Sequence, residues 1–560
     1  MGTSGNNPGY KVFSISTTIR NPRRNTEFLE VLKNFDNEDL TNEVKDNIYY
    51  ELIKHGIYKF NKLDSIIKEK YKNGVVLSDE EIKRIIDDNP QKTGDEGRVM
   101  TQIRALKDTG LVSLGGNRAM QHLKITKLGK ALIDGYDSEN VYTKAMVGLH
   151  ANNPQRTTIY NKSRPFLNTL FVINEINQHY ESNKGILWHE FAAFILPMKD
   201  CDYEKTAKDI IDYREKFGHK INQSWLENYM FNIVGVNRIQ FRSILKDYAD
   251  DVFRKFDMTG LLVSSGFREN TYIRFNEYND TKVKSILKEY AGYKFQSFSS
   301  DDEYYDYLYE INLPWEESEE VKKEIIISKQ KILGVTVNSE ESLDQQLSDL
   351  DSIHNKRIFD SSVEEFEFNL LKNELLLLSR NRGDESEFKD VPEPVRLEWL
   401  VALITAKRFG SKYIKPNLSL DEKGIPKSFA TGGMADIEFI SEKLYCLIEV
   451  TLQQDYKQQL NSETTSISDH LKQLDTDKEK CSLLIAPRIH DRVAEFFVFV
   501  TMFDQLMITA MTIEYYVDMV NEDATIDSFA DAIKEMNNYM CQRNVEEKYC
   551  DYMNRYRATA

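Results

Sequence analysis

Residues 434–451, MADIEFISEKLYCLIEVT, decide the fold of the C-terminal part of the chain. Two short apolar runs flank a polar Ser-Glu-Lys step, which predicts two strands joined by a tight turn. If Glu442 and Lys443 form a two-residue turn, the register places Asp436 directly opposite Glu449. Opposed residues on antiparallel strands have Cβ atoms about 4.5–5.5 Å apart. The stretch therefore predicts two facing carboxylates, a pairing that a turn one residue longer or shorter would break.

The two faces of this predicted hairpin differ in polarity. The apolar face must be buried and carries Ile437, Phe439, Leu444, Cys446, Ile448 and Val450. Facing carboxylates repel each other, and a divalent cation with hard oxygen ligands is a natural compensation. The hairpin thus predicts a divalent-cation site at Asp436 and Glu449. Two acids at the solvated ends of an exposed strand pair are the alternative.

Further acidic residues stand in the segments on either side of the hairpin. Upstream, PVRLEWLVALITAKRFG predicts an apolar helix that carries Glu398. Downstream, QQLNSETTSISDHLKQL places Glu463 and His470 seven residues apart, on one face if this segment is helical. CSLLIAPRI then predicts another central strand. This order of helix, strand, strand and helix predicts an αββα arrangement that carries Glu398, Asp436, Glu449 and Glu463.

Length and composition favour a cytoplasmic protein of several domains. The chain has 560 residues and a net charge of −17, which argues against wholesale coating of nucleic acid but allows a local basic face. We find no apolar run of 18 residues and no secretory signal in the first residues. The five cysteines show no C-x-x-C pair, so free thiols are expected and a zinc site is not.

A basic cluster lies at the first predicted helix. KVFSISTTIRNPRRNTEFLEVLKNF predicts a short strand and then a helix that starts at Asn21 and Pro22. The positive charges of Arg20, Arg23 and Arg24 oppose the helix dipole there. A DNA phosphate backbone would relieve this repulsion, and a solvated basic turn is the alternative.

Residues 78–135 have the element order of a winged-helix unit. SDEEIKRIIDD and EGRVMTQIRALKDTG predict two helices, LVSL and HLKI a hairpin, and TKLGKALIDG a closing helix. Winged helices commonly place one helix in the major groove and the wing on the backbone, although many contact only protein. The residues expected to contact DNA are Arg98, Gln102 and Arg104 on or near the reading helix, and Arg118 and Lys124 on the wing.

The phrase TGLVSLGG at Thr109 returns as TGLLVSSG at Thr259, which predicts a second winged-helix-like module. Two such modules could span a short duplex site, or either could be a structural brace. The acidic and aromatic residues that follow predict a helical connector. The sequence thus predicts a multidomain α+β fold: winged-helix-like helical subdomains over 1–155 and 156–295, a helical linker over 296–390, and an α/β domain over 391–560.

The acidic residues carry a resemblance to a known family. The order Glu398, Asp436, Glu449-Val450-Thr451, Glu463 resembles the nuclease domain of the AlwI-type restriction endonucleases, which are type IIS enzymes related to nicking endonucleases that recognise GAGTC. FSISTTIRNPRR is similar to that family's opening, and LEW, EVT and APRI fit its pattern. The resemblance spans most of the chain and is weakest over 296–390.

This resemblance implies a modular enzyme. An N-terminal part built from winged-helix-like subdomains would recognise double-stranded DNA. A C-terminal PD-(D/E)XK-like domain would use Mg²⁺, with Mn²⁺ as a substitute, to cut a few bases outside an asymmetric site. Asp436, Glu449 and the carbonyl of Val450 would bind the metal. Glu398 and Glu463 would complete a second site or hold metal-bound water, and His470 would contact phosphate or orient a carboxylate. A cognate DNA methyltransferase is the expected companion. Because each chain has one nuclease domain, double-strand cleavage implies transient dimerisation through it, a second subunit or two sequential events.

Two other functions stay open at this stage: a strand-specific nicking enzyme, and a DNA-binding subunit whose nuclease fold is silent. One position also departs from the wider nuclease superfamily, because Thr451 stands where a lysine is usual. Glu463, or a second metal that it holds, would have to help orient water. Lys457 and His470 are the nearby alternatives.

Overall fold

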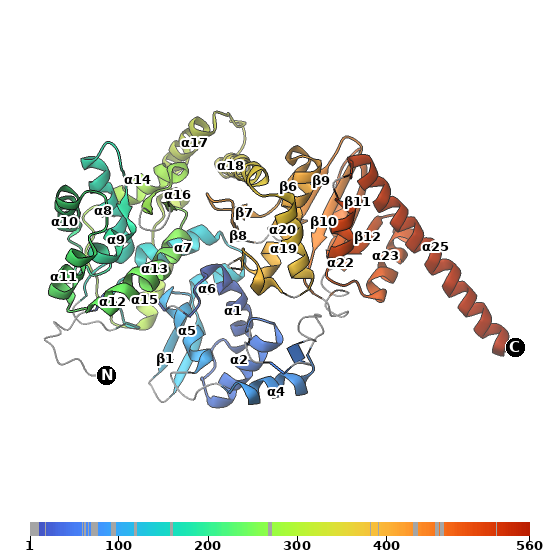
Figure 1. The fold of residues 1–560 in the computed structure, drawn as a ribbon, viewed down its shortest axis with the longest axis horizontal. Coiled ribbons are helices and arrows are strands. Elements are labelled where there is room, and N and C mark those ends of the chain that lie inside the picture. The colour runs from blue at the N-terminus through green and yellow to red at the C-terminus, as the bar shows by residue number, and fades with distance from the viewer. Residues whose placement is uncertain are drawn as a thin grey trace. The chain divides into compact units, whose positions relative to one another are not determined.

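The chain folds as a multidomain α+β protein in which helices predominate and one mixed five-stranded sheet lies in the C-terminal part (Figure 1). It is a computed structural model that describes residues 11–16, 18–58, 60, 63–64, 67–68, 77–90, 97–116, 120–156, 161–266, 271–380, 382–389, 391–428, 435–453, 459, 464–521 and 523–559. The chain forms two units, one of Met1–Tyr58 with Pro90–Ser352 and one of Lys59–Asn89 with Ile353–Ala560.

The first module of the N-terminal unit contains the predicted helix, hairpin and closing helix. Its elements are η1 (Pro22–Arg24), α1 (Asn25–Leu32), η2 (Lys33–Phe35), α2 (Asn42–Lys54), α5 (Arg98–Asp108), β1 (Val112–Gly116), β2 (Gln121–Ile125) and α6 (Lys127–Ile133). Asp39 adds an antiparallel bridge to His122 on β2. The predicted helix over 78–88 exists as α4 (Asp79–Asp88) with its capping box, but it groups with the other unit. The helices packed on α5 and α6 are instead α2 and α1.

The second module repeats this order with insertions. Its elements are α7 (Ser138–Gly148), α8 (Pro165–His179), β3 (Ile186–Leu187), α9 (Trp188–Glu190), η4 (Phe191–Ile195), α10 (Tyr203–Phe217), α11 (Gln223–Val234), α12 (Arg238–Ser243), η5 (Ile244–Tyr248), α13 (Ala249–Asp257), β4 (Leu262–Ser265), β5 (Tyr272–Phe275), η7 (Glu277–Asn279) and α14 (Asp280–Glu289). β5 lies between β3 and β4 in an antiparallel sheet. Each module therefore runs helix, strand or bridge, helix, helix, hairpin, helix.

The hairpins of the two modules form equivalent hydrogen bonds at matched positions. Gly110 and Gly260 both adopt a positive φ, where a side chain would strain the turn. The Thr126 hydroxyl donates to the Gly110 carbonyl, and the Asn276 side-chain amide donates to the Gly260 carbonyl. Val112 pairs with Ile125 just as Leu262 pairs with Phe275. The repeated phrase noticed in the sequence is thus a repeated structural corner.

Helices occupy most of residues 301–379. The helices are α15 (Asp301–Tyr309), α16 (Pro314–Glu317), α17 (Glu319–Leu333), α18 (Leu343–Glu365) and α19 (Phe368–Ser379). α15 packs on α6 and α7 within the first unit and buries Tyr304 and Leu308. This burial explains why the acidic segment also contains aromatic residues. Ser362 lies inside α18, where its hydroxyl donates to the Ile358 carbonyl.

The C-terminal unit is built around the five-stranded sheet, ordered β12-β11-β10-β9-β6. Its elements are η8 (Gly383–Glu385), α20 (Glu393–Phe409), η9 (Ser411–Tyr413), β6 (Ile414–Pro416), β7 (Ser419–Leu420), β8 (Pro426–Ser428), β9 (Ile437–Ile440), β10 (Leu444–Val450), α22 (Thr464–Gln473), β11 (Glu479–Ala486), α23 (Asp491–Asp504), β12 (Met507–Thr512), α24 (Ile513–Met519) and α25 (Ile526–Thr559). β10, β11 and β12 are parallel, whereas β9 is antiparallel to both of its neighbours.

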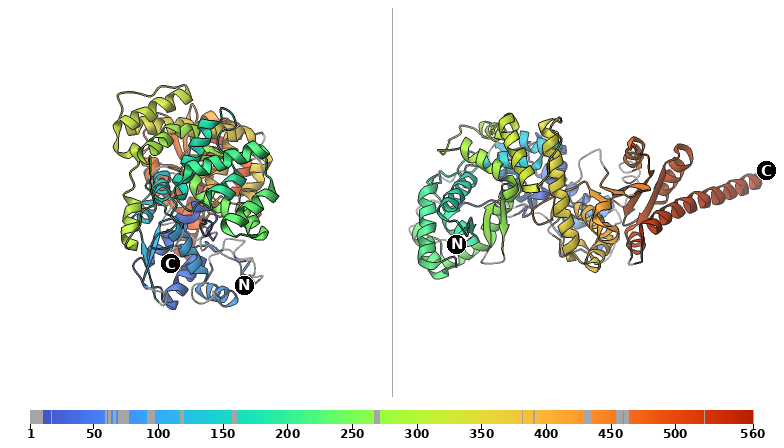
Figure 2. Two further views of the ribbon diagram at one scale, coloured as in Figure 1. Left: turned by 90° about the vertical axis from the view of Figure 1, so that its left-hand side faces the viewer. Right: turned by 90° about the horizontal axis from the view of Figure 1, so that it is seen from above.

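Both faces of this sheet are covered. Ile437 and Ile448 belong to a core shared with Leu400 of α20. On the other face Leu447 packs with Leu471 of α22 and with residues of α23. Figure 2 shows α25 running well past the sheet. Among the helices described, none combines the length and the hydropathy that a membrane span requires.

A buried ion pair holds the second module together. Arg214 of α10 binds both carboxylate oxygens of Glu190, at 2.8 and 2.6 Å, and donates to the Gly185 carbonyl at 2.8 Å. The Leu187 amide donates to the same carboxylate. Both charged side chains are almost fully buried, so neither charge can be hydrated if its partner is lost.

We expect Arg214→Met to leave the Glu190 carboxylate buried without its cation and to lower the free energy of unfolding by about 3–5 kcal/mol. Urea denaturation of the full chain, followed by tryptophan fluorescence to which Trp188 and Trp225 contribute, measures this loss. Lys208→Met on the exposed side of α10 is the control and should change stability by less than about 0.5 kcal/mol. Equal effects of the two variants would contradict a supporting role for the ion pair.

Candidate active site

The hairpin forms in the predicted register. Ile437 pairs with Ile448 on β9 and β10, and the Ser441 amide donates to the Leu444 carbonyl to close the turn. One step beyond the last pair, Asp436 therefore lies opposite Glu449. The Val450 amide donates to Asp436 Oδ2 at 2.8 Å, which ties the aspartate to the end of β10. The predicted pairing is confirmed, and so is the apolar face behind it.

Glu449 is held from the helix side of the sheet. It is 8% exposed, and its Oε1 lies 2.8 Å from His470 Nδ1 on α22. α22 is placed by the burial of Ile467 and Leu471, which pack on the same sheet face as Leu447. His470 therefore orients the glutamate carboxylate, one of the two roles that the sequence suggested for it.

A third strand adds polar residues that the sequence interpretation missed. β6 lies beside β9, and the Asn417 amide that follows it donates to the Asp436 carbonyl at 3.1 Å. The Asn417 side chain donates to the Ala435 carbonyl at 2.8 Å and to Glu438 Oε1 at 3.0 Å. Asn417 thus fixes the backbone on both sides of the position that carries the aspartate. Its Lys-Pro-Asn context gave no periodic signal, because this strand pairs with a segment far along the chain.

Glu438 is the centre of this polar cluster. It accepts hydrogen bonds from Lys415 at 2.8 Å, from Asn417 and from the Tyr445 hydroxyl. Burial raises the pKa of Glu438, but these hydrogen bonds outweigh it and hold the pKa below its usual value. The carboxylate therefore stays charged at neutral pH and adds negative potential on the face that carries Asp436.

The other predicted site residues are distributed as follows. Glu398 lies on α20 and is 6% exposed. Glu463, Lys457 and Arg118 lie outside the described residues. Within the described residues, no group of three or more His, Cys, Asp or Glu side chains is placed to hold a metal ion, so Glu398 does not join Asp436 and Glu449 in such a group. The structure sets Asp436 opposite Glu449 and places His470 in contact with Glu449.

Thr451 is fixed where the lysine of the wider superfamily was expected. Its amide donates to the Ile485 carbonyl at 3.0 Å, and its hydroxyl accepts from the Gln453 amide at 3.1 Å. The side chain is buried. Thr451 therefore serves the end of β10 structurally and supplies no cation.

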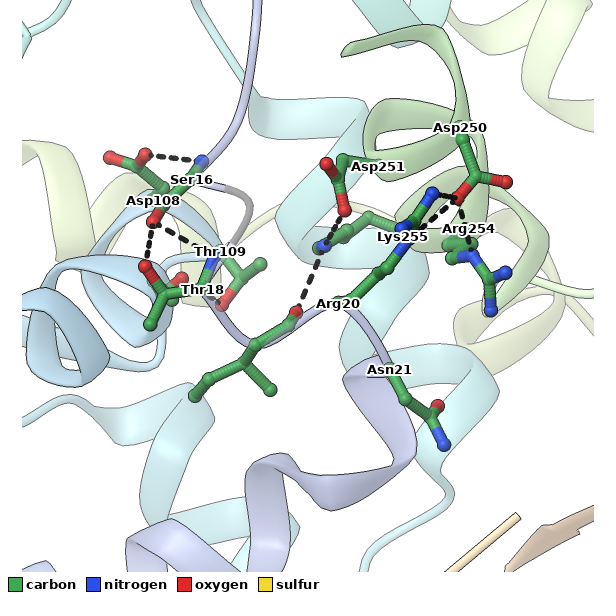
Figure 3. A network of polar contacts seen from close by, with 12 residues as sticks. Ser16, Thr18, Arg20, Asn21, Asp108, Thr109, Asp250, Asp251, Arg254 and Lys255 are labelled. Atoms are coloured by element: carbon green, nitrogen blue, oxygen red, sulfur yellow. Dashed lines mark hydrogen bonds and ion pairs between the residues drawn. The ribbon is translucent and has the colours of Figure 1, made fainter. Parts of the chain in front are cut away.

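The N-terminal arginines take part in a network that ties the two modules of the first unit together (Figure 3). The Ser16 amide donates to Asp108 at the end of α5, and Lys255 of α13 donates to the Ile19 carbonyl at 3.2 Å. Arg20 donates through Nε and Nη2 to Asp250 of α13, both at 3.0 Å. Ser16, Ile19 and Arg20, which precede α1, thus connect α5 with α13, and we call them the strap.

The remaining residues expected to contact DNA are mostly engaged with the protein. Arg24 donates to Glu27 and to the Ile57 carbonyl, and Arg23 lies in η1. Arg98 donates to the Tyr49 hydroxyl at 3.3 Å, and Lys124 pairs with Asp302. Gln102 and Arg104 are half-buried on α5. Arg24, Arg98 and Lys124 thus have partners within the protein, and contacts of this set of residues with DNA remain predictions.

Comparison with known proteins identifies the family of the chain. The family model described as the AlwI restriction endonuclease matches residues 107–519, well over half of the chain. The chain belongs to the AlwI restriction endonuclease family. This membership makes the chain a restriction endonuclease, a nuclease that acts on DNA, and confirms the resemblance noted from the order of the acids.

Two solved structures are similar to the chain only weakly. One is the small subunit of the heterodimeric restriction endonuclease R.BspD6I, with 19% identity, 30% of this chain and 97% of that chain covered, and a TM-score of 0.22. The other is restriction endonuclease FokI, with 11% identity, 89% and 93% covered, and a TM-score of 0.22. Likeness at this level carries no argument about the site. No curated protein matches the chain.

The contact between His470 and Glu449 leads to a testable expectation. Partners of a metal ligand typically change metal affinity or activity about 10–100-fold when they are removed. We expect His470→Ala to raise the Mg²⁺ concentration needed for half-maximal cleavage by about that factor. His470→Asn, which keeps a donor near Nδ1, should restore most of the affinity. Plasmid-cleavage rates across a Mg²⁺ titration measure this, and an unchanged requirement in His470→Ala would contradict the orienting role.

Proposed function

We propose that the chain is a type IIS restriction endonuclease that binds a short asymmetric double-stranded DNA site and uses Mg²⁺ to hydrolyse phosphodiester bonds a few bases outside it. The single observation that carries this proposal is the pairing of β9 with β10, which sets Asp436 opposite Glu449 at the end of a buried sheet. Membership of the family supplies the class of substrate.

The chemistry of these donors fits a Mg²⁺ ion. Mg²⁺ is commonly bound through one or two carboxylates, with its other positions left to water and substrate phosphate. Asp436 and Glu449 would hold the ion, with the carbonyl of Val450 as a further ligand, and Mn²⁺ would fit the same oxygens. When bound, the ion acidifies water and stabilises the charge that develops on the phosphate.

The chain's own residues prepare this site. The Val450 amide positions Asp436 through Oδ2, and the His470 side chain positions Glu449 through Oε1. The buried apolar face behind the hairpin prevents either strand from slipping, because a one-residue slip would turn that face to solvent. Glu398 and Glu463 remain proposed as contributors to a second site or as holders of a water molecule.

In this proposal another residue must take the place of the lysine that orients the attacking water in the wider superfamily. Thr451 cannot supply a cation, so Glu463, Lys457 or His470 would orient the attacking water. Of these, His470 is the residue that the structure already places in contact with a proposed metal ligand.

Recognition of DNA is assigned to the N-terminal unit. Its two modules have the element order of winged helices, a fold that commonly places a helix in the major groove. Contacts of lysine and arginine with phosphate would set the register, whereas contacts with base edges would select the sequence. A cognate DNA methyltransferase is the proposed companion that protects host sites.

The number of strands cut depends on how nuclease domains meet. The described residues hold one facing pair, Asp436 and Glu449, and one pair can cut one phosphodiester bond at a time. Double-strand cleavage would then need a transient dimer through the nuclease domain, a second subunit or two sequential events. A strand-specific nicking enzyme is the second candidate function, and the same observation favours it. A catalytically silent DNA-binding subunit is the third alternative.

Plasmid cleavage with Mg²⁺ tests the proposed function directly. Loss of a metal ligand removes several kcal/mol of transition-state stabilisation, so Asp436→Ala should lower the cleavage rate by at least about 100-fold. Glu442→Ala removes an exposed acid from the turn of the same hairpin and should cleave like the wild-type chain. Run-off sequencing of the products gives the site and the offset, and the ratio of nicked to linear plasmid separates the two enzyme functions.

Two outcomes would contradict the proposal. If the wild-type chain neither nicks nor cuts any of a broad set of plasmids with Mg²⁺ or Mn²⁺, the silent alternative holds. If Asp436→Ala cleaves as fast as Glu442→Ala, the reaction takes place at another site.

A further inference from the structure

The second module contains a helical extension that the first module lacks. α12, η5 and α13 follow one another without a break, so that one helix runs from Arg238 to Asp257 (Figure 1). In the first module the matching helix, α5, begins at Arg98. When Gly110 of the first module is aligned with Gly260 of the second, Arg98 corresponds to Tyr248. Residues 238–247 are therefore an addition to the repeated module.

The extension is anchored on one side and exposed on the other. Phe241 and Ile244 are buried and fix it to the module. Asn237 caps its first turn by accepting from the amides of Ile239 and Gln240. The opposite side is exposed to solvent at Arg238, Arg242 and Lys246.

That outer face carries a row of positive charges. Arg238, Arg242 and Lys246 are exposed and spaced four residues apart, which places them along one ridge of the helix. The wider turn of the π-helical segment η5 helps to keep them aligned. Arg238 is 65% exposed and lies 3.2 Å from Glu227. The acid of the extension, Asp247, lies one position off the ridge.

The strap extends the same ridge. The next residue along it is Asp250, an acid that accepts hydrogen bonds from Arg20 of the strap and from Arg254 one turn later. Asp247 and Asp251 also lie within electrostatic reach of Arg20, so acids balance the cations at this end of the ridge. The cations that remain exposed on the extension, Arg242 and Lys246, can complement a polyanion such as the DNA backbone.

The end of the extension also offers an apolar side chain. Ile239 is 76% exposed in the first turn of the helix. Base edges in the major groove are contacted by the N-terminal residues of a reading helix, and a thymine methyl group is recognised by apolar contact. An exposed isoleucine beside a row of cations fits this use.

The matching helix of the first module is less suited to this task. On α5 the Lys107 side chain is largely withdrawn from solvent and donates to the Gln155 carbonyl, and Gln102 and Arg104 are half-buried. We propose that residues 238–248 are the element of the second module that enters the major groove of duplex DNA, with Arg242 and Lys246 on phosphates and Ile239 on a base edge. This inference rests on the proposed function and names the surface that gives it its sequence preference.

Binding and cleavage of DNA by the full-length chain test this inference separately. Binding is measured without Mg²⁺ on a pool of randomised duplexes over a range of salt concentrations. Arg242→Ala and Lys246→Ala should each weaken binding to all sequences and reduce the slope of log K against log salt by about 1. Ile239→Ala should reduce discrimination at one or two base pairs by about ten-fold, with little effect on the salt slope.

The controls are Lys208→Ala on α10 and Lys284→Ala on α14, exposed lysines elsewhere in the same module that should bind like the wild-type chain. If the three variants of the extension bind DNA with the affinity, salt slope and preference of these controls, the inference is overturned. Mg²⁺-dependent cleavage by the same variants would then still support the proposed function. If the wild-type chain binds duplex DNA in this assay but cleaves none, the proposed function fails and the binding data still decide the role of the extension.

Discussion

The pairing of β9 with β10 is the constraint on which the proposed catalytic site depends. Its register sets two carboxylates across from each other, and the Val450 amide and His470 hold them in place. Such an arrangement is unfavourable for two free anions and favourable around a cation. The buried apolar face behind the strands prevents the register from slipping. Packing of these side chains therefore keeps the two carboxylates opposite each other although the carboxylates repel. The fold thereby maintains the geometry that the proposed metal site requires.

The sequence was informative wherever the structure is local. The hairpin register follows from a two-residue turn and from alternating side chains, so Asp436 and Glu449 could be paired by counting residues. The role of His470 was within reach because helical spacing gave its face. Asn417 could not be found this way, because β6 meets β9 across a long stretch of chain and leaves no periodic signal. Residue spacing likewise gave no means to judge whether Glu398 reaches the pair.

The N-terminal unit shows the same contrast between local and distant order. The repeated Thr-Gly-Leu phrase predicted a second module, and the matched hydrogen bonds at Gly110 and Gly260 explain why those residues recur. The expectation that α4 would join the first module was wrong, because amphipathic helices of similar length cannot be assigned to a partner from their pattern alone. Charge near a helix start was also ambiguous, since the structure pairs Arg20 with Asp250 as part of a strap. The exposed side chains of the helix that begins at Arg238 could not be identified from the sequence, because residue spacing does not give solvent exposure.

Metal binding by the facing carboxylates is the central claim, and titration with Mn²⁺ monitored by electron paramagnetic resonance tests it most directly. The wild-type chain should bind Mn²⁺ at a site that Mg²⁺ displaces. Asp436→Asn and Glu449→Gln should each weaken that binding by at least about ten-fold, because each removes a charged oxygen ligand. Glu442→Gln, in the turn of the same hairpin, should bind like the wild-type chain. Retention of wild-type Mn²⁺ affinity by both Asp436→Asn and Glu449→Gln would contradict the assignment of this site.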